Sequence, residues 1–120
     1  MKDYSIAGIG EVLWDLFPEY KRLGGGTANF AYHVSQFGFD AAVASALGHD
    51  PLGDEVVRTL EDNKVGYLLP QVDFPTGTVQ VEVNSDGVPR YDIREQVAWD
   101  HIPYTDSLRE LARNCCAVCF

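Results

Sequence analysis

The sequence predicts an α/β fold in which helices flank a mostly parallel β-sheet and a small β-hairpin forms a lid beside it. The first observation is the alternation of short apolar runs with amphipathic segments over residues 4–63, because strand–helix–strand successions wind onto a parallel sheet. The second is a change after residue 75 to strict alternation of apolar and polar side chains, which is typical of an antiparallel hairpin. The length of 120 residues allows one small domain.

The first predicted elements surround a run of glycines. Residues 4–10 are apolar and punctuated by glycine, so we expect a buried first strand there, and residues 12–17 continue as a second extended piece. Residues 19–23 are polar and are predicted to form a loop or the tip of a hairpin. A helix follows, with Thr27 as its N-cap and Gly38 as its stop. Its inward side chains are expected to be Ala28, Phe30, Ala31, Val34 and Phe37.

A second strand and helix are predicted next along the chain. Residues 41–47 are small and apolar, as expected of a buried strand. Asp50 and Pro51 then predict a helix start, because proline fits the first helical position and acidic residues occupy the first turn. We expect this helix to reach about Asn63. Its inward side chains are predicted to be Val56, Val57 and Leu60.

The lid hairpin is predicted from a pattern of period two. Residues 76–84 alternate between apolar and polar side chains, a turn signal stands at residues 85–87, and residues 88–94 return as the second strand. The side chains expected to share the apolar face are Val79, Val81 and Val83.

The end of the chain is apolar and carries no cap, turn or polar tail. A short helix is predicted over residues 106–113, and residues 115–120 follow as the last strand. Because chain termini usually lie at the surface, we expect the sequence to be the N-terminal part of a longer protein.

The charge of the chain excludes two classes of partner. It contains 18 acidic residues against 9 lysines and arginines, for a net charge of -9. Such a chain repels nucleic acids and anionic membranes, so neither is an expected partner. No apolar run approaches the ~20 residues of a membrane helix. The odd, clustered set of three cysteines fits a reducing cytoplasm better than a disulfide framework.

Two glycine motifs are candidates for a binding site. Gly8-Ile9-Gly10 begins like a dinucleotide-binding fingerprint, but Leu13 stands where the third glycine is needed, and a tight turn explains the motif as well. The run at residues 24–26 lets the backbone approach a ligand closely. No phosphate-loop lysine follows it, so a neutral, hydroxyl-rich ligand fits as well as a phosphate. A flexible turn is an equally good interpretation.

Two polar side chains suit a sugar ligand. The amide of Asn29 can both donate and accept hydrogen bonds, although it also fits a capping role. Asp15 ends an apolar extended run, where strands of α/β sheets open onto clefts, and its carboxylate can accept two hydroxyl hydrogen bonds. Taken alone, a solvated loop acid explains Asp15 better. The three histidines and three cysteines match no ligand pattern, so no metal site is predicted in this chain.

Taken together, these blocks and their order are similar to those of a known family. The chain resembles the N-terminal portion of the PfkB/ribokinase family of carbohydrate kinases, and within it a fructokinase. The resemblance rests on Gly8–Asp15, Gly24–Ala31, Gly38, Gly48–Gly53, Leu60 and Pro75–Val79. Thr27 departs from the pattern, since many members carry proline there, which leaves the loop less constrained.

The resemblance implies a ribokinase-like fold, of which residues 1–120 are the N-terminal part with lid segments around 12–23 and 65–99. It implies ATP-dependent phosphorylation of a sugar hydroxyl by the longer protein. The catalytic Asp is expected beyond residue 120, with ATP and Mg²⁺ bound mostly outside this chain, so that residues 1–120 alone are inactive. The implied substrate-binding residues are Asp15, Gly25, Gly26, Asn29, Val79 and Val81, with the apolar lid face turned toward the sugar.

Several alternatives stay open. Fructose is the expected acceptor, but relatives use ribose, 2-keto-3-deoxygluconate or nucleosides. The chain is also consistent with a non-catalytic sugar-binding or regulatory fragment, or with a truncated reading frame. Lids of this family often pair between subunits, so the resemblance implies a homodimer of the full-length protein.

Overall fold

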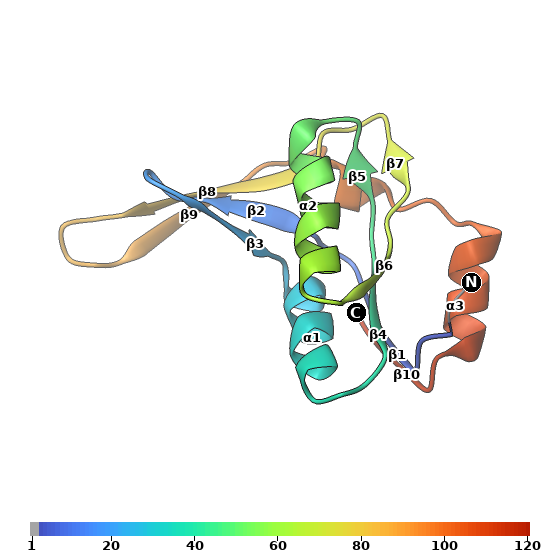
Figure 1. The fold of residues 1–120 in the computed structure, drawn as a ribbon. Helices are drawn as coiled ribbons and strands as arrows, with labels where there is room; N and C mark the ends of the chain where they lie inside the picture. Colours follow the sequence, from blue (N-terminus) through green and yellow to red (C-terminus); the bar gives the residue numbers. More distant parts are fainter. Residues whose placement is uncertain (1–2) are drawn as a thin grey trace.

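Residues 3–120, described here by a computed structural model, form a parallel sheet with helices on both faces and a second sheet that projects from it (Figure 1). The parallel sheet has the order β10–β1–β4–β6. Its strands are Ala117–Cys119 (β10), Ile6–Ile9 (β1), Ala41–Ala44 (β4) and Gly66–Leu68 (β6). Ile6 pairs with Ala117 on one side and with Ala41 on the other. The predicted α/β fold with a parallel sheet is therefore confirmed.

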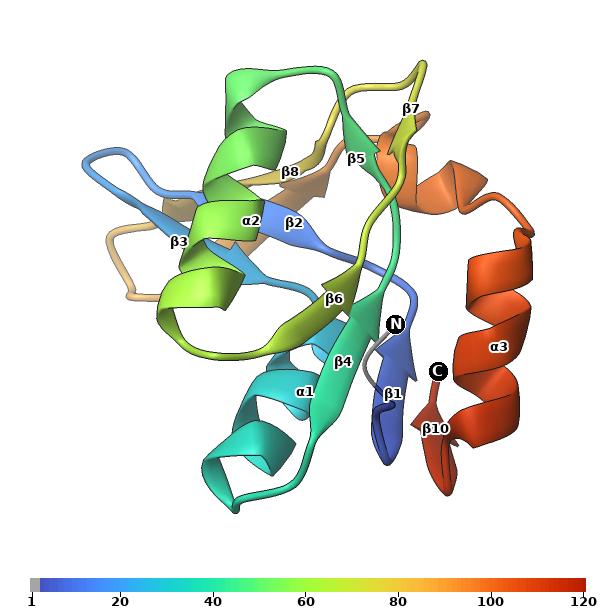
Figure 2. The same ribbon diagram turned by 45° about the vertical axis from the view of Figure 1, so that its right-hand side comes forward.

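The helices cover the two faces of this sheet unequally. The longer helices α1 (Gly26–Gln36) and α2 (Pro51–Asp62) lie on one face, and α3 (Asp106–Asn114) lies on the other (Figures 1 and 2). A short 3₁₀ helix, η1 (Ala98–His101), precedes α3. None of the helices in residues 3–120 is long and apolar enough to cross a membrane.

Strand β4 is buried on both faces because it lies between the two helical layers. Ala41 and Val43 belong to the core cluster under α1 and α2, whereas Ala42 and Ala44 pack with Leu111 of α3. This alternation follows from the period of two along a strand. The predicted buried strand over residues 41–47 is thus confirmed in its first half. After Ala44 the chain leaves the sheet, and a separate strand, β5 (Leu47–Gly48), pairs with β7 (Gln71–Val72).

The second sheet, called the lid sheet below, has the order β3–β2–β8–β9. Its strands are Lys21–Gly24 (β3), Leu13–Leu16 (β2), Gly77–Val83 (β8) and Pro89–Ile93 (β9). Two antiparallel hairpins, β2–β3 and β8–β9, are joined by a parallel pairing of β2 with β8. All four strands overlap the predicted lid segments 12–23 and 65–99, but the second of these ranges also contains β6 of the parallel sheet.

The ends of the two long helices follow their sequence signals. Gly38 ends the α1 region with a φ of 91°, a left-handed conformation that favours glycine. Asp50 caps α2 by accepting a hydrogen bond from the N–H of Gly53 (2.8 Å), and Pro51 is the first helical residue. The predicted stop of α1 and start of α2 are confirmed.

Four local predictions are wrong. The N-cap of α1 is Gly25, and Thr27 is a buried helical residue instead. Of the predicted loop or hairpin tip over residues 19–23, Glu19 and Tyr20 do lie in the turn of the β2–β3 hairpin, but residues 21–23 belong to strand β3, since pairing with β2 satisfies their backbone. Phe37 is 82% exposed because it stands at the C-cap, after the helical stripe has ended. Val83 is 57% exposed because β8 extends here beyond the end of β2.

Candidate functional site

A hollow of about 190 Å³ lies where the lid sheet meets the first turn of α1. It is lined by Glu11, Leu13, Asp15, Gly25, Gly26, Val79, Tyr91 and Ile93. Leu13 and Asp15 are alternate residues of β2 and therefore share a face. Val79 pairs with Asp15 and also with Ile93, so the pairing brings these side chains onto the same face of the lid sheet. The lid thus supplies an apolar wall, and Asp15 and Glu11 supply carboxylates.

Asp15 holds its position between two neighbouring strands. It pairs with Arg22 on β3 and with Val79 on β8. A Cβ atom on Gly24 would lie 2.6 Å from Oδ2 of Asp15, so the first glycine of the run leaves room for this carboxylate. Burial raises the pKa of Asp15 above its ordinary value, the charge of Arg22 partly opposes this shift, and the charge of Glu11 adds to it. A partly desolvated carboxylate of this kind binds hydroxyl donors strongly.

Glu11 is a second carboxylate in the hollow, and it is not among the predicted site residues. Its Oε1 accepts a hydrogen bond from the N–H of Gly26 (3.0 Å), the first residue of α1. Its carbonyl accepts a hydrogen bond from the hydroxyl of Thr27 (3.1 Å). The signal that could have found it is its place directly after the first strand, where the carboxyl end of a strand opens onto a cleft.

The second glycine of the run is required by the close approach of these two segments. Gly25 has a φ of 104°, and a Cβ atom there would collide with the carbonyl of Glu11. Both the conformation and the lack of space therefore demand glycine at this position. The close approach brings the backbone of Gly25 and Gly26 into the lining of the hollow.

The structure brings four of the six predicted site residues together. Asp15, Gly25, Gly26 and Val79 line one hollow. Val81 lies in the small core cluster of the lid with Leu13 and Val79, and it is 2% exposed. Its side chain therefore supports the wall of the hollow from within.

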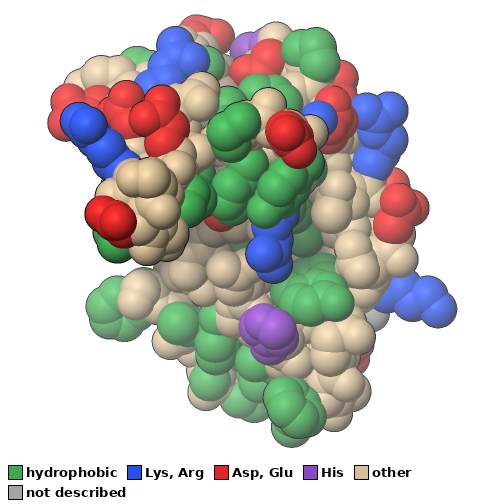
Figure 3. Space-filling view, turned by 90° about the vertical axis from the view of Figure 1, so that its left-hand side faces the viewer, with side chains coloured by type: hydrophobic (Ala, Val, Ile, Leu, Met, Phe, Trp, Pro, Cys, Tyr) green, Lys and Arg blue, Asp and Glu red, His purple; other side chains and the backbone are tan. Residues whose placement is uncertain are grey.

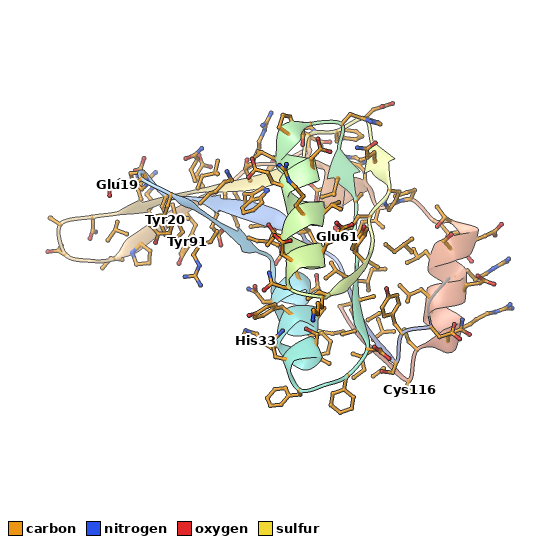
Figure 4. All side chains as sticks on the ribbon, in the orientation of Figure 1. Glu19, Tyr20, His33, Glu61, Tyr91 and Cys116 are labelled. Carbon is orange, nitrogen blue, oxygen red and sulfur yellow. The ribbon has the colours of Figure 1, made fainter. Side chains whose placement is uncertain are left out.

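Asn29, the remaining predicted site residue, lines a different hollow. This second hollow has a volume of about 310 Å³ and lies between β3, α1 and α2. It is lined by Arg22, Leu23, Ala28, Asn29, Tyr32, His33, Thr59, Leu60 and Asn63. Figure 3 looks at the lid side of the molecule and shows the surface hollowed between the lid and a histidine, and Figure 4 shows His33 on the outer side of α1.

Three further residues that line the first hollow are not among the predicted site residues. Tyr91 and Ile93 are 60% and 59% exposed, and they come to the hollow because β9 pairs with β8. Leu13 comes to it because β2 pairs with β8 in parallel. Figure 4 shows Tyr91 on the lid sheet and Glu19 at the tip of the β2–β3 hairpin. Only the strand pairing reveals this set.

Residues 19–94 match the sequence model of a protein family that is described as the pfkB family carbohydrate kinases. The chain belongs to this family. The match covers β3, α1, α2 and the β8–β9 hairpin but begins after β2, so Glu11, Leu13 and Asp15 of the first hollow precede it. The family assigned from the order of the glycine blocks is thereby confirmed.

Known relatives of this PfkB-family chain carry different names. An ATP-dependent 6-phosphofructokinase from Thermoanaerobacterium thermosaccharolyticum is 28% identical over 125 residues, which cover 94% of this chain and 38% of the relative. An uncharacterized sugar kinase from Pyrococcus horikoshii, solved also in complex with ATP, is 29% identical with a TM-score of 0.71, covering 78% of this chain. A fructokinase from Halothermothrix orenii shares the fold, with a TM-score of 0.79 at 20% identity over 95% of this chain.

The PfkB-family chain spans less than half the length of each of these relatives. It covers 36% of the Pyrococcus protein and 45% of the Halothermothrix protein. Within residues 3–120, no three histidine, cysteine, aspartate or glutamate side chains are placed to hold one metal ion. No residue of this chain is assigned to ATP or Mg²⁺.

Proposed function

We propose that the protein containing this chain transfers the γ-phosphoryl group of ATP to a hydroxyl of a free sugar, with fructose as the acceptor. The observation that carries the proposal is the hollow at the start of α1, in which the carboxylates of Asp15 and Glu11 face an apolar lid wall. Membership of the pfkB family and the ATP complex of the Pyrococcus relative support the reaction class.

The residues of the hollow have distinct roles in this proposal. Asp15 accepts hydrogen bonds from two sugar hydroxyls and fixes the ring. Gly25 and Gly26 let the sugar approach the backbone closely, because they present no side chains. Val79 forms part of a lid wall that excludes water, which would otherwise accept the phosphoryl group. This chain thus holds and shields the acceptor, and orientation of this kind is a large part of catalysis in phosphoryl transfer.

Two predicted residues keep less direct roles. Val81 stiffens the lid from its core, as its 2% exposure indicates. Asn29 is proposed to bind a sugar hydroxyl, a role that requires the second hollow and the first to be bridged by one ligand. Catalytic Asp, ATP and Mg²⁺ sites are proposed for the part of the protein beyond residue 120. The protein is proposed to be cytoplasmic, in keeping with its free cysteines at positions 115, 116 and 119.

The test is a coupled assay of ADP release with the full-length protein and a panel of acceptors. Fructose, ribose, 2-keto-3-deoxygluconate, a nucleoside and fructose 6-phosphate should be compared. Asp15→Ala should lower kcat/KM for the preferred sugar by about two orders of magnitude, since it removes charge-assisted hydrogen bonds. Little change in kcat/KM would refute the proposed role of Asp15 in binding the sugar. Sugar binding without ADP release would instead support the non-catalytic alternative.

A sugar phosphate is the second candidate acceptor, because the Thermoanaerobacterium relative is a 6-phosphofructokinase. The hollow argues against it, since its lining contains two acidic residues and no lysine or arginine. Fructose and fructose 6-phosphate differ only in the phosphate group. Their kcat/KM values in the panel therefore separate the two candidates directly.

We also propose that two copies pair through their lids. The β8–β9 hairpin exposes several apolar side chains that nothing in residues 3–120 covers. These are Val83, Val88, Tyr91 and Ile93, each more than half exposed. Val83→Lys should convert the full-length protein to a monomer in analytical ultracentrifugation. A dimer that persists unchanged in this variant would place the interface elsewhere.

A further inference from the structure

We propose that Glu11 determines which acceptors the hollow admits: it excludes phosphorylated sugars and admits neutral ones. This inference rests on the proposed function, because it concerns the acceptor of the same reaction. It makes Glu11 a specificity-determining residue that shapes the charge of the site and takes no part in phosphoryl transfer itself.

Glu11 is fixed at both of its ends against the start of α1. Its Oε1 accepts the hydrogen bond from the N–H of Gly26 at 3.0 Å. Its carbonyl accepts the hydrogen bond from the hydroxyl of Thr27 at 3.1 Å, and Thr27 is only 8% exposed. Because the backbone and the side chain are both held, the carboxylate stays beside the first turn of α1 and in the lining of the hollow.

The start of α1 would suit an anion if Glu11 were absent. The first N–H groups of a helix lack partners within the helix and lie at the positive end of its dipole, so they attract phosphate. The first turn of α1 contains no acidic residue, and its N-cap, Gly25, has no side chain that could accept a hydrogen bond. Glu11 supplies the missing negative charge from a different segment. A phosphate group would have to displace it.

Asp15, the second acidic residue in the hollow, carries a negative charge like that of Glu11. Asp15 lines the hollow with Glu11, and the charge of Glu11 disfavours the ionised form of Asp15, which indicates that the two carboxylates interact. Arg22 lies across the strand pair from Asp15 and offsets part of this negative charge, but it lines the second hollow.

The two kinds of acceptor respond to this charge in opposite ways. Hydroxyl groups donate hydrogen bonds to carboxylates, so a neutral sugar gains from both acidic residues. A sugar phosphate carries a charge of about −1.5 to −2 near pH 7 and presents acceptor oxygens, so it is repelled by the same residues. The discrimination therefore follows from the negative charge of the hollow, to which Glu11 contributes.

The test compares Glu11→Gln with the unaltered full-length protein. Glutamine keeps an oxygen that can accept from the N–H of Gly26 but removes the negative charge. We expect the ratio of kcat/KM for fructose to that for fructose 6-phosphate to fall about tenfold, because the variant relieves the repulsion of the phosphate and also loses part of the attraction for the hydroxyl groups of fructose. Inorganic phosphate should compete with fructose at a lower concentration in the variant.

Glu19→Gln is the matched control, because it removes the same charge at the exposed tip of the β2–β3 hairpin (Figure 4). It should leave both the ratio and the phosphate inhibition unchanged. The inference is overturned if Glu11→Gln keeps the ratio of the unaltered protein, or if Glu19→Gln shifts it equally.

Two further measurements keep the test independent of folding and of turnover. If Glu11→Gln does not fold, a salt series on the unaltered protein applies, and higher ionic strength should narrow the ratio because it screens the repulsion. A ratio that does not depend on salt contradicts the inference. If no acceptor is phosphorylated, the proposed function fails, and calorimetric titration with inorganic phosphate then decides the role of Glu11: tighter binding by Glu11→Gln than by Glu19→Gln supports it, and equal binding refutes it.

Discussion

Replacing Asp50 with alanine is expected to lower the free energy of unfolding by about 3 kcal/mol. The carboxylate of Asp50 joins the start of α2 to the start of β8 in the lid sheet. Oδ1 accepts hydrogen bonds from the N–H of Gly53 (2.8 Å) and from the hydroxyl of Thr76 (2.6 Å), and Oδ2 accepts one from the N–H of Thr76 (2.9 Å). The hydroxyl of Thr76 in turn accepts from the N–H of Gly48 (3.0 Å).

The magnitude follows from what the substitution leaves behind. Loss of an N-cap costs about 1 kcal/mol, and each buried donor left without a partner costs about 1–3 kcal/mol. Thr76 is 1% exposed, so water cannot easily replace the lost acceptor for its N–H and hydroxyl groups. Because Asp50 itself is only partly buried, we take the lower end of this range for each group.

The assay is urea unfolding of the full-length protein, with Asp54→Ala as the control. Asp54 lies in the same first turn of α2 and is exposed, so its loss removes a carboxylate without breaking the network. The effect of the control should stay below about 1 kcal/mol. Equal destabilisation by the two variants would refute the reasoning, because the helix dipole alone would then explain both.

The same network predicts a pH dependence. Burial by itself would raise the pKa of Asp50, but the hydrogen bonds from Thr76 and Gly53 and the nearby His49 lower it below its ordinary value. A lowered folded-state pKa contributes stability that is present above the unfolded-state pKa of about 3.9 and is lost as the pH falls through the folded-state value. The stability difference between Asp50→Asn and the unaltered protein should therefore be largest near neutral pH and shrink below about pH 4. A constant difference across this range would contradict the lowered pKa.

Three further predictions concern the hollow and its support. Asp15→Asn should raise the melting temperature near pH 7 while lowering sugar turnover, because burial raises the pKa of Asp15 and makes its ionised form destabilising; this gain should vanish below about pH 4 in thermal melts. Gly24→Ala should raise KM for the sugar, and this effect expressed as a free energy should exceed the loss in the free energy of unfolding, since the Cβ atom of alanine would meet Oδ2 of Asp15 at 2.6 Å. An unchanged KM would show that Asp15 can move aside. Trp14→Phe should cost about 1–2 kcal/mol in urea unfolding, because it removes the hydrogen bond from Nε1 of Trp14, which is 5% exposed, to the carbonyl of Leu52 (2.9 Å). A loss close to zero would mean that water replaces this bond.

Features set by neighbouring residues are those that the sequence predicts well. The start of α2 depends on Asp50 and Pro51, which act within one helical turn. The β8–β9 hairpin depends on an alternating pattern and a turn signal at residues 85–87, and β4 depends on an unbroken apolar run. The hydrophobic effect and local backbone preferences fix these elements wherever the segment lies in the fold.

Features that depend on pairing between distant segments are those that the sequence leaves open. Strand β3 is polar at Lys21 and Arg22, and it is a strand because β2 pairs with it. The sequence predicts Thr27 as a helix N-cap, but its hydroxyl donates a hydrogen bond to the carbonyl of Glu11, and the N-cap position is occupied by Gly25. In both cases a contact formed in the tertiary structure replaces the local preference.

The sequence by itself therefore determined the family and the parallel sheet, and it singled out Asp15 and the glycine run as candidate binding residues. Only the tertiary structure decided which side chains share one hollow. The parallel pairing of β2 with β8 brings Asp15 to Val79 across more than 60 residues of chain, and the packing of Glu11 on α1 adds a second carboxylate. The same arrangement places Asn29 in a separate hollow, because its side of α1 meets residues of β3 and α2 instead of the lid face that carries Asp15.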